Sequence, residues 1–241
     1  MRYANVLLVV LIAVCLISGS RVECLAMDTG FTTEMLSEED KKTFLNNIKI
    51  SYLECESKKD AIECFDVNEK GLIVLGHETS NDKKICIYTS EGEFQYGCSF
   101  ECTGKFGVEF DGDNVIIYFV RSDVAVEINS KGEVENVLKI QDTIENNSYW
   151  NNSVFQNKRT QVDREYVLKN DMGILNLLAS SYSQLVIIDN SGNEEIIYDV
   201  NSEQLSGMLK TFVVIFVFVF IVLCTVVVAL IKGLRKYKKL K

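Results

Sequence analysis

An uninterrupted apolar stretch near the end of the chain constrains its architecture more than any other feature. Residues 212–231 read FVVIFVFVFIVLCTVVVALI, without a charge, a glycine or a proline. A helix of this length, rising about 1.5 Å per residue, is about 30 Å long, which matches the hydrocarbon core of a bilayer. Inside lipid every backbone N–H and C=O group needs a partner within the segment, so the stretch predicts one transmembrane helix.

The residues on either side of this stretch indicate how it crosses the membrane. Residues 232–241 carry six basic side chains and no acidic one, which the positive-inside rule places in the cytoplasm. Residues 201–211 then form a juxtamembrane segment, and the rest of the chain lies outside. We therefore expect a cell-membrane protein that crosses the bilayer once, with an outer N-terminal domain and a cytoplasmic tail.

The start of the chain has the three parts of an export signal. Arg2 supplies a positive charge, residues 6–17 form an apolar core, and Ser18-Gly19-Ser20 places small residues where a signal peptidase cuts. The apolar core is too short to span a bilayer comfortably, so residues 1–20 predict a cleaved signal peptide. An uncleaved anchor is the alternative.

The segment between signal and span is strongly acidic. It contains all 34 acidic residues but only 18 of the 25 basic ones, a net charge of −16. Nucleic acids and anionic membrane surfaces attract clustered Lys and Arg, so this charge argues against nucleic acid as a partner. Acidity of this kind serves solubility, or else the binding of a cation or a basic peptide.

Most of the outer segment has the sequence pattern of short β-strands separated by turns. Residues 21–60 form an N-terminal segment with one short helix, predicted over 38–46 and capped by Ser37. Over 61–200, apolar runs alternate with turns rich in Asn, Asp and Gly. They form three units of strand, tight turn, strand, polar loop, strand, glycine turn and strand, and the third unit carries an insertion at 143–162.

Regularly spaced glycines support this repeat. Each unit places one glycine in each of its two tight turns, where it allows a positive φ, and the separation of these two glycines shrinks from 21 to 20 to 19 residues. The pairs are Gly71 and Gly92, Gly112 and Gly132, and Gly173 and Gly192. In the third unit, the pattern predicts a strand over 174–178.

The run Ile85-Cys-Ile-Tyr-Thr-Ser-Glu-Gly-Glu-Phe94 resembles the outer hairpin of an NHL-type β-propeller blade. That resemblance covers 61–200 and implies a binding scaffold. Closed propellers have ~4–8 blades, so three units imply an open arc, a further unit hidden in 24–60, or a ring completed by a second chain. The layout also resembles uncharacterised single-pass membrane proteins of bacteria. We expect an all-β ectodomain of repeated four-stranded antiparallel units, arranged as a propeller-like arc or a β-sandwich, plus the transmembrane helix.

Six cysteines between Ser20 and the span make disulfides a prediction, because the count is even and the domain is exported. Cys86 and Cys98 flank the turn at Gly92, yet a three-residue loop would set Cys86 opposite Tyr96. Cys98 and Cys102 offer a small loop instead, and buried free thiols are the alternative. The six are Cys24, Cys55, Cys64, Cys86, Cys98 and Cys102.

No metal, cofactor or catalytic constellation stands out. The cysteines lack C-x-x-C spacing, and the only histidine, His77, is expected in an exposed polar loop. Asp111-Gly-Asp-Asn114 offers oxygens for Ca²⁺, but the same residues favour a hairpin turn, which we predict.

An aromatic group inside the insertion is the one candidate for binding. Tyr149, Trp150 and Phe155 stand together in polar sequence and form either a binding edge or a satellite core under the third unit. We expect a recognition or accessory protein with a protein partner or a second copy, beside its bilayer contact through 212–231. The alternative is an anchored hydrolase whose carboxylates come from separate units.

Overall fold

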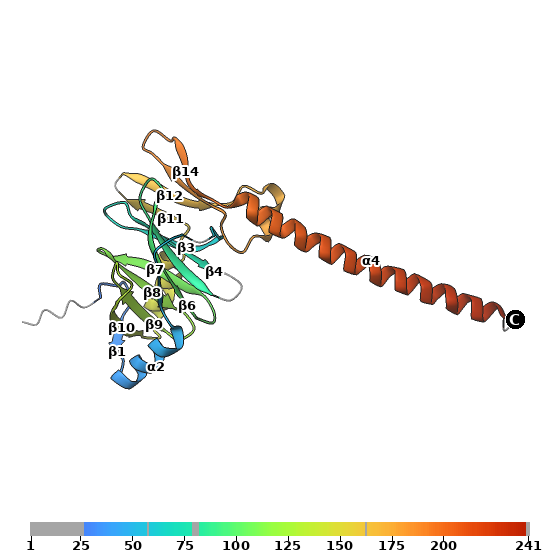
Figure 1. The fold of residues 1–241 in the computed structure, drawn as a ribbon, viewed down its shortest axis with the longest axis horizontal. Coiled ribbons are helices and arrows are strands. Elements are labelled where there is room, and N and C mark those ends of the chain that lie inside the picture. Colours follow the sequence, from blue (N-terminus) through green and yellow to red (C-terminus); the bar gives the residue numbers. More distant parts are fainter. Residues whose placement is uncertain (1–26, 57, 79–81, 162, 240–241) are drawn as a thin grey trace, which may run out of the picture.

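The computed structural model describes residues 27–56, 58–78, 82–161 and 163–239, which form three antiparallel sheets and one long C-terminal helix (Figure 1). The predicted signal peptide, residues 1–20, lies outside the described residues. The sheets are named first, second and third in the order in which their main strands occur along the chain.

The first sheet corresponds to the first predicted unit plus one additional strand. Its order is β2-β6-β5-β4-β3, with every neighbouring pair antiparallel. The strands are β2 (Ser51–Leu53), β3 (Ile62–Val67), β4 (Ile73–Glu78), β5 (Lys83–Tyr88) and β6 (Phe94–Phe100).

The second sheet has the same plan, in the order β1-β10-β9-β8-β7. Its strands are β1 (Thr33–Met35), β7 (Phe106–Asp111), β8 (Asn114–Phe119), β9 (Val124–Ile128) and β10 (Val134–Ile140). Because β1 and β2 extend these two sheets, the described part of 24–60 adds an outer strand to each and forms no separate unit.

The third sheet has four strands in the order β11-β12-β13-β14. They are β11 (Lys158–Gln161), β12 (Arg164–Lys169), β13 (Gln184–Ile188) and β14 (Glu194–Asp199). The first of them lies within 143–162, which the sequence analysis treated as an insertion, so the unit begins one strand earlier than predicted.

The prediction of a strand over 174–178 was wrong. These residues belong to a short 3-10 helix, η2 (Gly173–Leu178), which leaves the sheet between β12 and β13. Gly173 has a φ of +59°, and the side-chain oxygen of Asn176 accepts a hydrogen bond from the backbone N–H of Met172 at 2.8 Å. This local pairing closes a turn in place of a β ladder.

The first sheet lies between the other two, and each interface is a hydrophobic core (Figure 1). Aliphatic and phenylalanine side chains fill the core shared with the second sheet, including Val74, Ile117 and Phe100. The core shared with the third sheet also contains tyrosines, such as Tyr88 and Tyr198. Strand β3 contacts both β7 and β11, so the inner edges of the three sheets lie together.

Two glycines show why the predicted turn positions matter. All six predicted glycines have a positive φ. Gly112 forms, with Asp113, the two-residue turn of the β7–β8 hairpin, where Asp111 pairs with Asn114 as predicted. At Gly92 an added Cβ would lie 2.7 Å from the backbone oxygen of Ile197, so the close approach of the first and third sheets also requires glycine.

Short helices cover the second sheet. Helix α2 (Glu38–Ile48) confirms the predicted helix, and the Ser37 hydroxyl accepts a hydrogen bond from the N–H of Asp40 at 3.1 Å. Helix α3 (Ile144–Tyr149) continues into a π-helical turn, η1 (Trp150–Val154).

Helix α4 (Asn201–Lys239) leaves the sheets and extends away from them as a single rod (Figure 1). Its segment 201–232 is long and apolar enough to cross a membrane, and none of its most apolar window is buried against the rest of the chain. The helix therefore includes both the predicted span and the residues expected to form a separate juxtamembrane segment.

Candidate functional site

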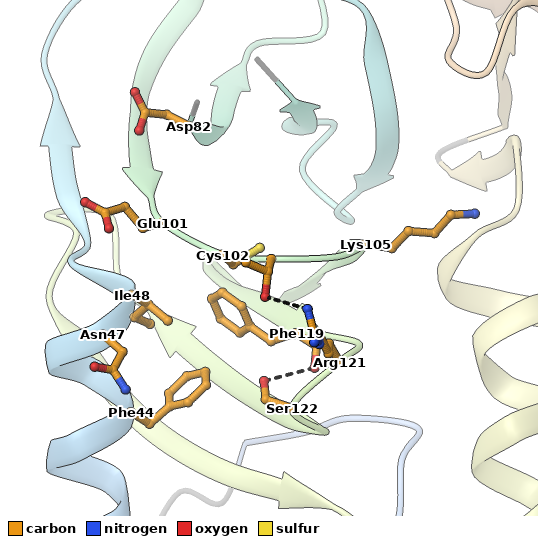
Figure 2. A pocket seen from close by; sticks show the side chains of 11 residues that line it. Phe44, Asn47, Ile48, Asp82, Glu101, Cys102, Lys105, Phe119, Arg121 and Ser122 are labelled. Carbon is orange, nitrogen blue, oxygen red and sulfur yellow. Dashed lines mark hydrogen bonds between the residues drawn. The ribbon is translucent and has the colours of Figure 1, made fainter. Parts of the chain in front are cut away.

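A half-open groove of about 810 Å³ lies beside α2 and is here called the α2 groove (Figure 2). Four separated segments build it: the C-terminal half of α2, the residue before β5, the loop from β6 to β7, and the end of β8 with the turn that follows it. Its lining residues are Phe44, Asn47, Ile48, Asp82, Glu101, Cys102, Thr103, Lys105, Phe119, Arg121 and Ser122.

The back wall of the groove is fixed by contacts between α2 and the sheets. Phe44 meets Phe119 edge to face, with ring centroids 5.2 Å apart. The N–H of Glu101 donates to the carbonyl oxygen of Ile48 at 2.7 Å, and the ammonium of Lys49 lies 3.0 Å from the Glu101 carboxylate. These contacts hold the helix against the end of β6 and keep one aromatic ring half-buried in the groove.

Charges of opposite sign stand on the two sides of this apolar wall. Figure 2 shows Asp82 and Glu101 on one side and Arg121 on the other, with the Phe119 ring between Glu101 and Arg121. The guanidinium of Arg121 donates to the hydroxyl of Thr103 at 3.3 Å, which steadies the β6–β7 loop. The groove therefore suits a ligand that combines an apolar group with polar ends.

Cys102 is the only groove residue with a thiol, and the thiol is poorly suited to catalysis. Burial raises its pKa above the ordinary value, so at neutral pH it remains a protonated, weak nucleophile. No histidine lines the groove as described.

His77 is not in an exposed loop, as the sequence analysis expected, but on β4 and fully buried. Its Nδ1 lies 3.1 Å from the carbonyl oxygen of Ala61, its Nε2 has no hydrogen-bond partner in the described structure, and its ring stacks on Tyr198. Desolvation lowers its pKa to about 4, so it is a neutral core residue at physiological pH. Strand β4 continues through Gly76 to Glu78, and the polar residues at its end had indicated a loop instead.

A second candidate site lies where the inner edges of the sheets meet. Asp66 of β3 accepts hydrogen bonds from the Arg159 guanidinium of β11 at 2.9 Å and from the backbone N–H of Phe110 on β7 at 2.8 Å. Arg159 also donates to the carbonyl oxygens of Ser153 and Val154. A cavity of about 480 Å³ lies beside this ion pair, so the three sheets share one polar junction.

A second carboxylate lies close to this junction. Glu109 of β7 accepts hydrogen bonds from the hydroxyls of Tyr118, at 2.6 Å, and Tyr149, at 2.9 Å. Desolvation raises the pKa of Glu109 above its usual value, and the nearby charge of Asp66 adds to this effect. Burial likewise raises the pKa of Asp66. In the sequence each is one of two acids within a short, otherwise apolar run, and nothing there marks it as buried.

The structure brings the predicted aromatic residues together but turns them inward. Trp150 is 9% exposed and packs against Phe31 and Tyr118, while Phe155 stacks on it with ring centroids 5.7 Å apart. These rings, with Tyr149, cover the outer face of the second sheet. The group is a satellite core rather than a binding edge, and it packs on the second sheet instead of the third.

The described cysteines are free thiols, and the disulfides expected among them are not formed. Cys86 pairs with Gly97 rather than Tyr96, and its side chain enters the core with the third sheet. Cys64 and Cys98 enter the opposite core, shared with the second sheet. The free thiols are Cys55, Cys64, Cys86, Cys98, Cys102 and Cys224.

Among residues 27–239, outside the gaps in the description, no group of three or more His, Cys, Asp or Glu side chains is placed to hold a metal ion. The Asp111–Asn114 segment is a hairpin turn, and the backbone N–H of Asp28 donates to the Asp111 carboxylate at 2.7 Å.

Comparison with known proteins finds no matching family model and no matching curated protein. Among solved structures, the chain is similar to a streptogramin B lyase at 10% identity and a TM-score of 0.27. The match covers 64% of this chain and 46% of the lyase, so the chain spans less than half of that protein. At this score the likeness bears on neither activity nor site.

Proposed function

We propose that this chain is a single-pass membrane protein whose three sheets form an open, propeller-like recognition domain outside the cell. Helix α4 supplies the anchor, because its apolar side chains are exposed and no described part of the chain covers them. The basic residues of 232–241 orient it with the tail in the cytoplasm, and residues 1–20 act as the export signal.

The recognition surface in this proposal is the α2 groove, and its ligand is a segment of another polypeptide. The observation that carries it is the apolar wall formed by Phe44 and Phe119, which has acidic side chains on one side and Arg121 on the other. An apolar anchor flanked by complementary charges is how protein surfaces select peptide segments. The protein then acts as an accessory or receptor subunit.

A photo-reactive side chain at Asn47 tests this proposal in native membranes, because Asn47 lines the groove and is exposed. Stoichiometric crosslinking to one protein is expected, and Arg121→Glu should reduce it strongly. Lys131→Glu is the matched control, since it makes the same charge change at an exposed turn outside the groove. Equal crosslinking from a photo-reactive Ser191 on the third sheet, or no loss with Arg121→Glu, would count against the groove.

An anchored hydrolase is the second candidate, and one observation favours it. Asp66 and Glu109 come from different sheets, the charge of Asp66 acts on Glu109, and both have raised pKa values, as general acids do; Asp66 also lines a cavity. Screening the full chain against ester and glycoside substrates tests this candidate. An activity lost in Glu109→Gln but kept in the groove variant Arg121→Glu would support hydrolysis, whereas an inactive wild-type chain would remove it.

A further inference from the structure

The loop between β12 and β13 exposes an unusual cluster of large apolar side chains. Within η2, Ile174 is 82% exposed, Leu177 is 85% exposed and Leu178 is 61% exposed. A 3-10 helix has three residues per turn, so Ile174 and Leu177 lie above one another on the same side. Exposed apolar clusters of this kind mark surfaces that another apolar phase covers.

This loop is tied directly to the first turn of α4. The side-chain amide of Asn201 donates to the carbonyl oxygen of Asp171 at 2.7 Å, and the amide of Gln204 donates to the hydroxyl of Ser181 at 3.2 Å. One hydrogen bond therefore lies on each side of η2 along the chain. Figure 1 shows the loop beside the first turns of α4, on the side of the sheets from which the helix departs.

The distances along α4 agree with a membrane contact. Asn201 lies about 16 Å along the helix from Phe212, where the uncharged stretch begins, at ~1.5 Å per residue. The headgroup layer occupies about 5–8 Å of that length on each side of the hydrocarbon core. Six residues of 3-10 helix, rising ~2 Å each, extend about 12 Å, a length similar to the distance that remains up to the headgroup layer.

We infer that η2 inserts its exposed apolar side chains into the outer leaflet beside α4 and sets the orientation of the sheets above the bilayer. This inference rests on the proposed function, because it requires α4 to cross the membrane. The loop 170–183 that contains η2 has one charged residue, the acidic Asp171, and no basic one. The contact is therefore hydrophobic and independent of anionic lipid.

Tryptophan quenching in reconstituted full-length protein tests the inference. Leu177→Trp places a probe on η2, Phe218→Trp places one in the middle of the span, and Ile144→Trp is a matched control. Ile144 is 84% exposed, and it lies on α3 at the second sheet. Each is compared with the parent protein, whose buried Trp150 is a constant background, in phosphatidylcholine vesicles with and without lipid brominated on its acyl chains.

Quenching and a blue shift are expected at Leu177→Trp and Phe218→Trp but not at Ile144→Trp, with or without added phosphatidylglycerol. Quenching at Phe218→Trp alone would overturn the loop insertion and leave the anchor intact. Absence of quenching at Phe218→Trp would overturn the anchor and the insertion together. A blue-shifted but unquenched Leu177→Trp would show that protein, rather than lipid, covers η2.

Discussion

The second and third sheets flank the first on opposite sides, yet their outer faces differ. The second sheet is covered by its own chain, through Phe31, Trp150 and the turn η1. The third sheet has no such cover among the described residues, and Ile196 on β14 remains 52% exposed. It carries instead the η2 loop and helix α4, so one end of the arc is covered and the other is joined to the proposed anchor.

This difference bears on how the arc is completed. A ring built from two chains requires sheet-to-sheet packing at both ends of each arc. At the second sheet, α3 and η1 occupy the face that a neighbouring sheet would need. Sheet-to-sheet packing on that face would require α3 and η1 to move, whereas the outer face of the third sheet stays accessible.

The largest expected effect comes from removing the cover. Trp150→Ala should lower the free energy of unfolding by about 3–5 kcal/mol, because it empties a buried aromatic cluster. Ile196→Ala, at the uncovered end, should cost about 0.5 kcal/mol or less, as surface changes usually do. Pulse proteolysis of the full chain in urea measures both values. Similar losses in the two variants would mean that the third sheet is also covered in solution.

The next effect separates the two interfaces by their response to acid. His77 stacks on Tyr198 at the third sheet, and burial lowers its pKa from 6.5 to about 4. The unfolded chain therefore binds a proton below pH 6.5 that the folded chain refuses. Stability from this group is complete above pH 6.5 and falls by roughly 3 kcal/mol as the pH drops toward 4. The aliphatic core with the second sheet contains no such base.

His77→Phe isolates this contribution, since it keeps the ring beside Tyr198 and removes the titration. The surrounding groups are Lys84, whose charge lowers the pKa further, and Asp60, whose charge opposes it. Buried carboxyls such as Asp66, with raised pKa values, act in the opposite direction and are common to both proteins. Amide exchange at β13, corrected for intrinsic rates, should rise on acidification only with His77 present. An equal rise in His77→Phe would refute the assignment.

The features that the sequence predicted correctly are those that depend on neighbouring residues in the chain. Local signals determined the parts that were right: glycines at turns with positive φ, the Ser37 cap and the uninterrupted apolar stretch of 212–231. Each depends on residues a few positions apart. Such signals are independent of the tertiary fold, so they identify buried and exposed segments equally well.

Longer-range packing determined the parts that were wrong. His77 is buried because Tyr198 arrives from the third sheet, more than a hundred residues later. The apolar run 174–178 is too short for its period to distinguish a strand from a helix, and its hydrogen bonds are local. The α2 groove joins four distant segments without a motif, and among its lining residues the sequence had singled out only Cys102, as a disulfide candidate.

A smaller effect tests whether the stability of α2 supports the α2 groove. Ser37→Ala should destabilise α2 by about 1 kcal/mol, because the N–H of Asp40 loses its acceptor. The loss should appear as faster amide exchange in α2 and weaker crosslinking from Asn47, with no change in β13. Ser37→Asn restores an acceptor and serves as the control. Unchanged crosslinking in Ser37→Ala would separate the groove from the stability of the helix.

The smallest effect concerns the surface pair that joins β12 to β14 at the uncovered end. The Lys169 ammonium contacts the Glu194 carboxylate, and both side chains are more than a third exposed. A double-mutant cycle with Lys169→Gln and Glu194→Gln should give a coupling of at most about 1 kcal/mol, because solvent screens exposed pairs. Added salt should reduce the coupling further. A larger, salt-resistant coupling would show that this edge is shielded in the membrane-bound protein, and the contrast between the two ends of the arc would then be smaller than their packing indicates.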